Sequence, residues 1–263
     1  MAAKKSSDKP KSSVAAARGG KSGGHSLRWY WEGFKSLAGT IAIFLVLRTF
    51  LVEAYRIPSG SMIPTMLIGD WLFVNKLVYG PHIPFTHSNL PGYANPNRGD
   101  VVVFESPYQA DNGDDPTPIL VKRLIGMPGD TLYGRDGVVY VNGIAQRQGY
   151  TSPEQEKGDP NAVSEDFDWQ KKVGLTSSRF GAAPAQPKLD TWGPFIVPPG
   201  HYWMMGDNRY NSKDSRYWGF VPRENVRGRP LFVYYSYVPG NVSDRALSFI
   251  TDIRWSRIGH WIR

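Results

Sequence analysis

The apolar residues of this chain form one long run near its beginning and many short runs after it. The long run covers residues 36–52 and is interrupted by a single charge, Arg48. As a helix its 17 residues would measure about 26 Å, slightly less than the hydrocarbon thickness of a membrane. Trp29, Tyr30 and Trp31 precede the run, as aromatic residues do at membrane interfaces. The pattern therefore favours one membrane-spanning helix, which we place at residues 34–54.

Two alternatives for this run stay open. Val52-Glu53-Ala54 has small residues at a spacing that suits a signal-peptide cleavage site, and a helix of this kind can also be buried in a core. An anchor is favoured over a cleaved signal peptide because the basic region before the run is long. The positive-inside rule would then place the N-terminus in the cytoplasm and the chain from about Tyr55 onward on the outer side.

After residue 55 the apolar runs are short and are separated by glycine, proline and polar residues. We expect strands at residues 71–78, 101–104, 119–125, 138–141, 195–197, 201–205 and 231–238. Asn142-Gly143 directly after one of these runs predicts a tight hairpin. Short strands with frequent turns predict a mainly β fold, either a barrel or a sandwich. We assign residues 55–134 and 201–263 to this β domain and the polar region 135–200 to an inserted subdomain.

Composition and charge narrow the possible functions. The 263 residues include no cysteine, which excludes thiol catalysis, disulfides and thiolate metal sites. The net charge is +8, and residues 1–35 alone carry eight Lys or Arg against two acids, or +6. We read residues 1–33 as a disordered basic tail on the cytoplasmic side of a membrane. No basic patch with interleaved aromatic residues accompanies the tail, so we expect no nucleic-acid partner, and we expect neither a metal nor another cofactor.

A serine-rich loop follows the long apolar run. Pro58 and Pro64 restrict the backbone on either side of Ser59-Gly60-Ser61, so the hydroxyl groups should be held in a rigid, non-helical loop. Such a loop could present a nucleophile close to a membrane surface. It could also be an ordinary Ser/Gly turn.

Lys122 is the second candidate, because it interrupts the apolar strand at residues 119–125. In an alternating strand, either Lys122 or its neighbour Arg123 must point inward. An inward lysine loses hydration, which lowers its pKa, and a fall of about three pH units would cost roughly 4 kcal/mol. A neutral amine beside a serine can take the serine proton. The alternative for this strand is an edge position at which both charges are solvated. A Ser-His-Asp triad also stays open, because His82 and His87 lie in the loop between Ser61 and Asp100.

Four segments, taken in order, resemble bacterial type I signal peptidase, the membrane-bound leader peptidase. They are residues 58–66 with Gly69-Asp70, residues 98–104, residues 121–130 and residues 206–219. The resemblance implies that Ser61 is the nucleophile and that Lys122 is its general base. It implies an oxyanion hole formed by the Ser59 hydroxyl and the Ser61 backbone N–H. The further residues it implies are Ser212, which orients the lysine amine, Asp214 and Arg216 in the wall of the site, and Ile57, Pro58, Met62, Met66 and Val121 in the substrate pocket.

The same resemblance implies a function and a location. We expect a serine endopeptidase that cleaves signal peptides from exported preproteins after Ala-x-Ala sites, with preprotein signal peptides and membrane lipid as its partners. It would be a single-pass protein of the bacterial inner membrane. Tyr210 and Lys213 depart from the family pattern, and Lys213 adds a second amine near the site. A self-cleaving Ser-Lys protease and an anchored peptide-binding domain are the rival hypotheses. Residues 253–263 mix Trp, Ile and Arg, so they fit either a membrane interface or packing on the β domain.

Overall fold

The computed structural model describes residues 27–83, 86, 88–109, 113–147, 165–239 and 248–263. Most of the predicted basic tail lies outside these residues. The chain divides into a first unit that ends at Ile43 and a body from Phe44 to Arg263. The α1 helix (Leu27–Val46) is followed by a π-helical stretch (Leu47–Leu51), and residues 28–51 are long and apolar enough to cross a membrane by length and composition. The helical part begins before the predicted range 34–54, whose last three residues are already strand.

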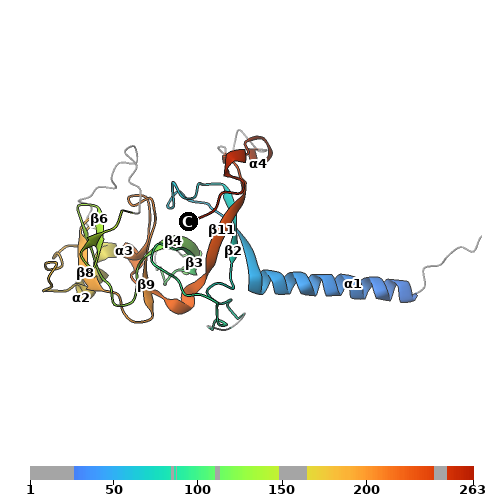
Figure 1. The fold of residues 1–263 in the computed structure, drawn as a ribbon, viewed down its shortest axis with the longest axis horizontal. Coiled ribbons are helices and arrows are strands. Elements are labelled where there is room, and N and C mark those ends of the chain that lie inside the picture. Colours follow the sequence, from blue (N-terminus) through green and yellow to red (C-terminus); the bar gives the residue numbers. More distant parts are fainter. Residues whose placement is uncertain (1–26, 84–85, 87, 110–112, 148–164, 240–247) are drawn as a thin grey trace, which may run out of the picture. The chain divides into compact units, whose positions relative to one another are not determined.

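The larger sheet of the body has seven antiparallel strands in the order β1-β2-β11-β3-β4-β9-β10. In sequence order the strands are β1 (Val52–Arg56), β2 (Asp70–Asn75), β3 (Val101–Glu105), β4 (Ile119–Gly126), β9 (His201–Met205), β10 (Val221–Pro222) and β11 (Val226–Ser236). The long strand β11, orange in Figure 1, runs between β2 and β3. It begins five residues before the predicted strand at 231, because polar Arg227 and Arg229 alternate with buried positions that the apolar pattern does not reveal.

A smaller sheet has the order β7-β6-β5-β8 and consists of β5 (Thr131–Arg135), β6 (Val138–Val141), β7 (Ile144–Ala145) and β8 (Trp192–Ile196). The predicted hairpin is confirmed: Asn142 and Gly143 have φ of 53° and 88°, as a two-residue primed turn requires. The sheet spans residues 131–196, slightly before the predicted insertion at each end. Between β7 and β8 lie the 3-10 turn η2 (Glu165–Phe167) and the α2 helix (Trp169–Val173).

The mainly β prediction is confirmed, and the remaining helices are short. They are α3 (Ser215–Trp218), η3 (Arg223–Asn225), α4 (Ser248–Thr251) and η4 (Trp255–Arg257). Residues 253–263 pack on the larger sheet, through backbone bridges Tyr237↔Ile253 and Phe232↔Trp261. Of the two alternatives for this segment, packing on the β domain is the one observed, although Trp255 and Trp261 remain exposed.

One apolar cluster of the larger sheet supports the serine-rich loop. It combines Ile57, Met62 and Met66 from the loop with side chains of β2, β3 and β11 and with Ile262. Each buried side chain of this size stabilises the fold by roughly 1.5–3 kcal/mol. The loop is therefore attached to the core through the side chains of Ile57, Met62 and Met66.

Candidate active site

The serine-rich loop connects β1 to β2 and is closed at its base. Ile57 N–H donates to the Asp70 carbonyl at 2.8 Å, and Gly69 N–H donates back to the Ile57 carbonyl at 2.9 Å. Within the loop, Met66 N–H donates to the Met62 carbonyl, so this part coils as a helical turn with both methionines inward. Ser61 lies at the start of this turn and is only 9% exposed.

Lys122 reaches this serine from β4. Its position on the strand is fixed by pairing with Val102 of β3, and its side chain is 4% exposed. The Nζ atom lies 2.7 Å from Ser61 Oγ, which joins two residues that are 61 positions apart in the sequence. Burial lowers the pKa of Lys122 to about 8; the negative charge of Asp214 acts in the opposite direction. Lys122 therefore has an accessible neutral form near neutral pH, in which its lone pair can accept the serine proton.

Arg123, the neighbouring cation, is also buried. Its guanidinium holds Asp207 through two hydrogen bonds, Nε to Oδ1 at 2.7 Å and Nη2 to Oδ2 at 2.6 Å. It also donates to the Gly99 carbonyl at 2.6 Å. A planar arginine suits this two-point contact, so the charge of Arg123 is compensated by Asp207, whereas Lys122 forms no ion pair within the part of the chain that the structure describes.

The wall of the site is built on a second buried ion pair. Asp214 and Arg216 are joined by two 2.8 Å hydrogen bonds, and Asp214 also accepts from Gly206 N–H. Burial alone would raise the pKa of Asp214, but the Arg216 guanidinium holds it below its usual value. Asp214 thus stays ionised beside Lys122.

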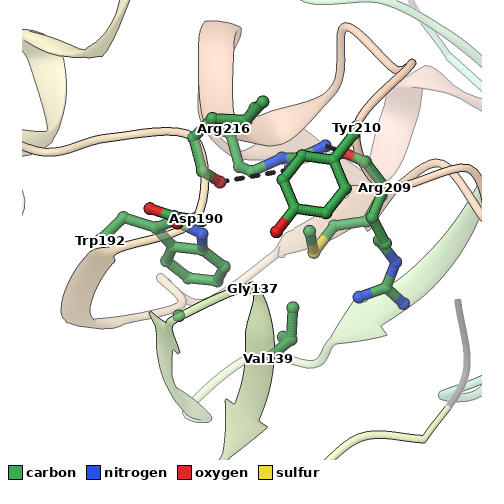
Figure 2. A pocket seen from close by; sticks show the side chains of 10 residues that line it. Gly137, Val139, Asp190, Trp192, Arg209, Tyr210 and Arg216 are labelled. Atoms are coloured by element: carbon green, nitrogen blue, oxygen red, sulfur yellow. Dashed lines mark hydrogen bonds between the residues drawn. The ribbon is translucent and has the colours of Figure 1, made fainter. Parts of the chain in front are cut away.

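Arg216 connects this wall to the segment that leads into β8 of the smaller sheet. Its Nη1 donates to the Leu189 carbonyl at 3.3 Å, and its Nη2 donates to the Arg209 carbonyl at 2.6 Å. Figure 2 shows Arg216, Arg209 and Tyr210 around a small cavity of about 10 Å³, with Asp190 opposite. Burial, followed by the charge of Asp190, raises the pKa of Tyr210. The Tyr210 hydroxyl lies against Gly137, in the turn between β5 and β6, so Tyr210 contacts the smaller sheet. Lys213, three residues further on, is half-buried.

Asn208 has a role that sequence reasoning missed. It is fully buried, its N–H donates to the Ser61 carbonyl at 3.0 Å, and its Nδ2 donates to the Gly60 carbonyl at 3.3 Å. A Cβ at Gly206 would lie 2.6 Å from the Ser61 carbonyl oxygen, so only glycine permits this close approach. The sequence signal that could have pointed to Asn208 is its place in the Gly206-Asp-Asn motif, at the start of the segment 206–219.

Two predicted serine contacts have different outcomes. Ser59 is exposed, with its Oγ 3.5 Å from Ser61 Oγ, so its hydroxyl lies next to the proposed nucleophile. The Ser212 hydroxyl is buried without a hydrogen-bond partner in the described structure, so the predicted bond to the Lys122 amine is not formed. The Lys122 amine is instead bonded to Ser61, and Ser212 packs against the bare backbone of Gly206.

The predicted substrate pocket needs correction. Met66 is 0% exposed and Met62 is 2% exposed, and both fill the core below the loop with Ile57. The helical turn directs them inward, so in this structure they offer no surface to a substrate. Pro58 is exposed and Val121 is half-buried, so these two can still line a pocket.

The histidine alternative finds no support in this geometry. The His82 ring bonds to Asn89 and Arg227, whereas the side chains bonded to Ser61 Oγ are Lys122 and Ser59. His87 lies outside the described residues. Within the described residues, no group of three or more His, Asp or Glu could hold a metal ion.

A buried serine hydroxyl bonded to a buried lysine amine is an arrangement that serine hydrolases can use. Comparison with known proteins agrees with this class: residues 30–235 match the family model described as signal peptidase, peptidase S26. Signal peptidase I of Pseudomonas fluorescens is 37% identical over 214 residues, which are 77% of this chain and 72% of that protein. The enzyme of the same name from Pseudomonas aeruginosa is 35% identical over 221 residues, 80% of this chain and 74% of that protein. For signal peptidase I of Aquifex aeolicus the identity is 30% over 244 residues, 81% of this chain and 88% of that protein.

The chain therefore belongs to the signal peptidase family, as the four sequence segments predicted. It is a serine peptidase that cleaves signal peptides.

Proposed function

We propose that this peptidase works through a Ser-Lys dyad made of Ser61 and Lys122. The observation that carries the proposal is the 2.7 Å contact between the buried Lys122 Nζ and Ser61 Oγ. The neutral amine would take the serine proton as Oγ attacks the scissile carbonyl carbon. The resulting ammonium would protonate the leaving amine as the peptide bond breaks, leaving an acyl-enzyme on Ser61. The amine would then activate water, which releases the acyl group.

Two donors are available for the oxyanion that forms during this attack. We assign them as the backbone N–H of Ser61 and the hydroxyl of Ser59. The position of Ser59, exposed and 3.5 Å from Ser61 Oγ, supports this assignment. Removing one such donor typically costs about 3 kcal/mol of transition-state stabilisation.

For the substrate, we propose signal peptides that end in an Ala-x-Ala site. The resemblance implies this specificity, and Pro58 and Val121 are the predicted pocket residues that keep accessible surface for a small side chain. We further propose that α1 anchors the enzyme in a bacterial inner membrane, with the basic N-terminus in the cytoplasm and the body in contact with lipid on the outer side. The apolar character of residues 28–51 supports this arrangement.

The dyad is tested with Ser61→Ala and Lys122→Met, assayed on a preprotein with an Ala-x-Ala site. Each should lower kcat by at least about a thousandfold while the protein stays folded. Lys172→Met, which removes an exposed lysine on α2, is the matched control and should keep wild-type activity. Cleavage that survives either dyad substitution would refute the assignment. A protein that cleaves only itself would favour the self-cleaving alternative.

The topology is tested with single cysteines, since the chain has none of its own. Tyr108→Cys, at a position 70% exposed on the body, should react with a membrane-impermeant maleimide in spheroplasts. Ser22→Cys in the basic tail should react only after the membrane is opened. The reverse result would contradict the proposed orientation.

A further inference from the structure

Residues 253–263, which we call the clamp segment, contact the serine-rich loop through two arginine side chains. Arg257 Nη2 donates to Asp70 Oδ2 at 2.5 Å and to the Thr65 carbonyl at 3.0 Å. Arg254 Nη2 donates to the Ile68 carbonyl at 2.5 Å. These contacts therefore hold two residues of the loop after Ser61, Thr65 and Ile68, and the first residue of β2, Asp70.

Asp70 makes these contacts strong. Its side chain is 0% exposed, and it also accepts hydrogen bonds from Leu67 N–H at 2.8 Å and from Ser236 Oγ at 2.6 Å. A buried carboxylate needs a compensating cation, and the clamp segment supplies two: Arg257 Nη2 lies 2.5 Å from Asp70 Oδ2, and Arg254 Nη1 lies 3.7 Å from Asp70 Oδ1. The geometry of the loop is thus coupled to a charge that comes from the clamp segment.

The clamp segment is itself fixed on the sheet. Ile262 N–H donates to the Leu231 carbonyl at 2.9 Å, and the Ile262 side chain is 5% exposed. That side chain belongs to the same apolar cluster as Met62 and Met66. The segment therefore contacts the loop through packing as well as through charge.

A third contact connects the clamp segment to β4, the strand that carries Lys122. Arg123, next to Lys122 on β4, donates through Nη2 to Thr65 Oγ1 at 3.3 Å and to the main-chain oxygen of Arg263 at 3.2 Å. One guanidinium thus joins the lysine strand, the serine loop and the clamp segment.

We propose that the clamp segment sets the distance between Ser61 and Lys122, and that Arg257 is its main positioning residue; this inference rests on the dyad proposed above. Arg257 contacts no reacting atom. Its loss should let the loop shift, and small misplacements of reacting groups lower the rate of the chemical step by up to about a hundredfold. The effect should appear in kcat, with KM nearly unchanged, because the substrate-facing surface is not altered.

The test uses the full chain in detergent micelles and a fluorogenic signal-peptide substrate. Arg257→Gln should lower kcat by about tenfold or more while KM stays within about twofold and the pH midpoint of kcat is unchanged. Arg257→Lys, which keeps the charge beside Asp70, should recover part of the loss. The matched control is Arg223→Gln, which removes an arginine bond to the Tyr79 carbonyl at 2.8 Å and should keep wild-type kcat. A folded Arg257→Gln enzyme with wild-type kcat would overturn the proposal.

A milder pair of variants covers the case in which Arg257→Gln does not fold. Ile262→Val removes one carbon from the cluster below the loop, and Val141→Ala removes two carbons, a larger change, from the cluster that includes the smaller sheet. Ile262→Val should lower kcat about threefold and Val141→Ala should not, at equal folded fraction. Equal effects of both would refute the clamp. If Ser61→Ala and Lys122→Met abolish cleavage but the clamp variants do not alter kcat, the dyad stands and only the clamp is wrong.

Discussion

Replacing Lys122 with methionine should make the protein more stable at neutral pH while destroying its activity. The unfolded chain titrates Lys122 near 10.5, whereas burial lowers the pKa in the folded protein to about 8. Each pH unit of difference is worth about 1.4 kcal/mol, so the folded protein carries a penalty of about 3 kcal/mol wherever both states are protonated. Methionine fills a similar volume without the charge. After subtracting about 1 kcal/mol for the lost hydrogen bond to Ser61, we expect a gain of about 2 kcal/mol.

This gain has a definite dependence on pH. Between about pH 8 and 10.5 the folded protein releases the Lys122 proton while the unfolded chain keeps it, so the stability of the wild type rises with pH there. The advantage of Lys122→Met should therefore be about 2 kcal/mol smaller at pH 9.5 than at pH 6.5. Guanidinium unfolding of both proteins at the two pH values measures it. A variant that is less stable than wild type at pH 6.5, or an advantage that does not change with pH, would refute the reasoning.

Three further substitutions test the wall around the dyad. Asp214→Asn leaves Arg216 buried without its partner, so calorimetry should show a loss of about 3–5 kcal/mol; because Asp214 raises the pKa of Lys122, the pH midpoint of kcat/KM should also fall. An unchanged midpoint would show that Asp214 does not act on the amine. Ser212→Ala removes a hydroxyl without a bonding partner in the described structure, so we expect unchanged stability and a loss of kcat below about tenfold; a hundredfold loss would mean that the hydroxyl bonds to the amine during turnover. Asn208→Ala removes a side-chain bond to the Gly60 carbonyl and should lower kcat about tenfold at constant KM, and a loss confined to KM would contradict its positioning role.

The burial of Lys122 could be anticipated from the sequence because a charge in an apolar strand is a signal of its own, whereas the pairing of Lys122 with Ser61 came from the resemblance. Two adjacent cations in an alternating strand required one of them to be buried, and the structure buries both. What the strand pattern could not reveal is the partner of each. Asp207 lies 84 residues from Arg123, and only the tertiary fold shows that it, rather than solvent, compensates that charge.

Other functional details depend on contacts that have no local signature. Asn208 donates hydrogen bonds to the main-chain oxygens of Gly60 and Ser61. Every residue has a main-chain oxygen, so the side chains of the loop do not reveal this partner. Met62 and Met66 were expected to face the substrate, but a helical turn that periodicity does not predict directs them into the core. Ser212 was assigned a role by resemblance alone, and its rotamer in this structure does not reach the amine.

Part of the fold could also be predicted from the sequence. Apolar runs located seven of the eleven strands that the structure describes, and Asn-Gly located a hairpin. Strands β1, β5, β7 and β10 were not predicted, because β7 and β10 have only two residues each and the apolar residues of β1 and β5 are interrupted by charged residues or glycine. The start of β11 was missed because arginines occupy its outward positions. The exact extent of the first helix depends on where backbone pairing with β2 begins, at Val52, which composition alone does not indicate.

The most direct test of the account is the pH dependence of kcat/KM for signal-peptide cleavage. If the neutral amine of Lys122 is the base, kcat/KM should rise about tenfold per pH unit below pH 7 and level off above about pH 9, with a midpoint near the pKa of about 8. A profile that is flat from about pH 6 to 9, or that falls as the amine loses its proton, would contradict the proposed role of Lys122.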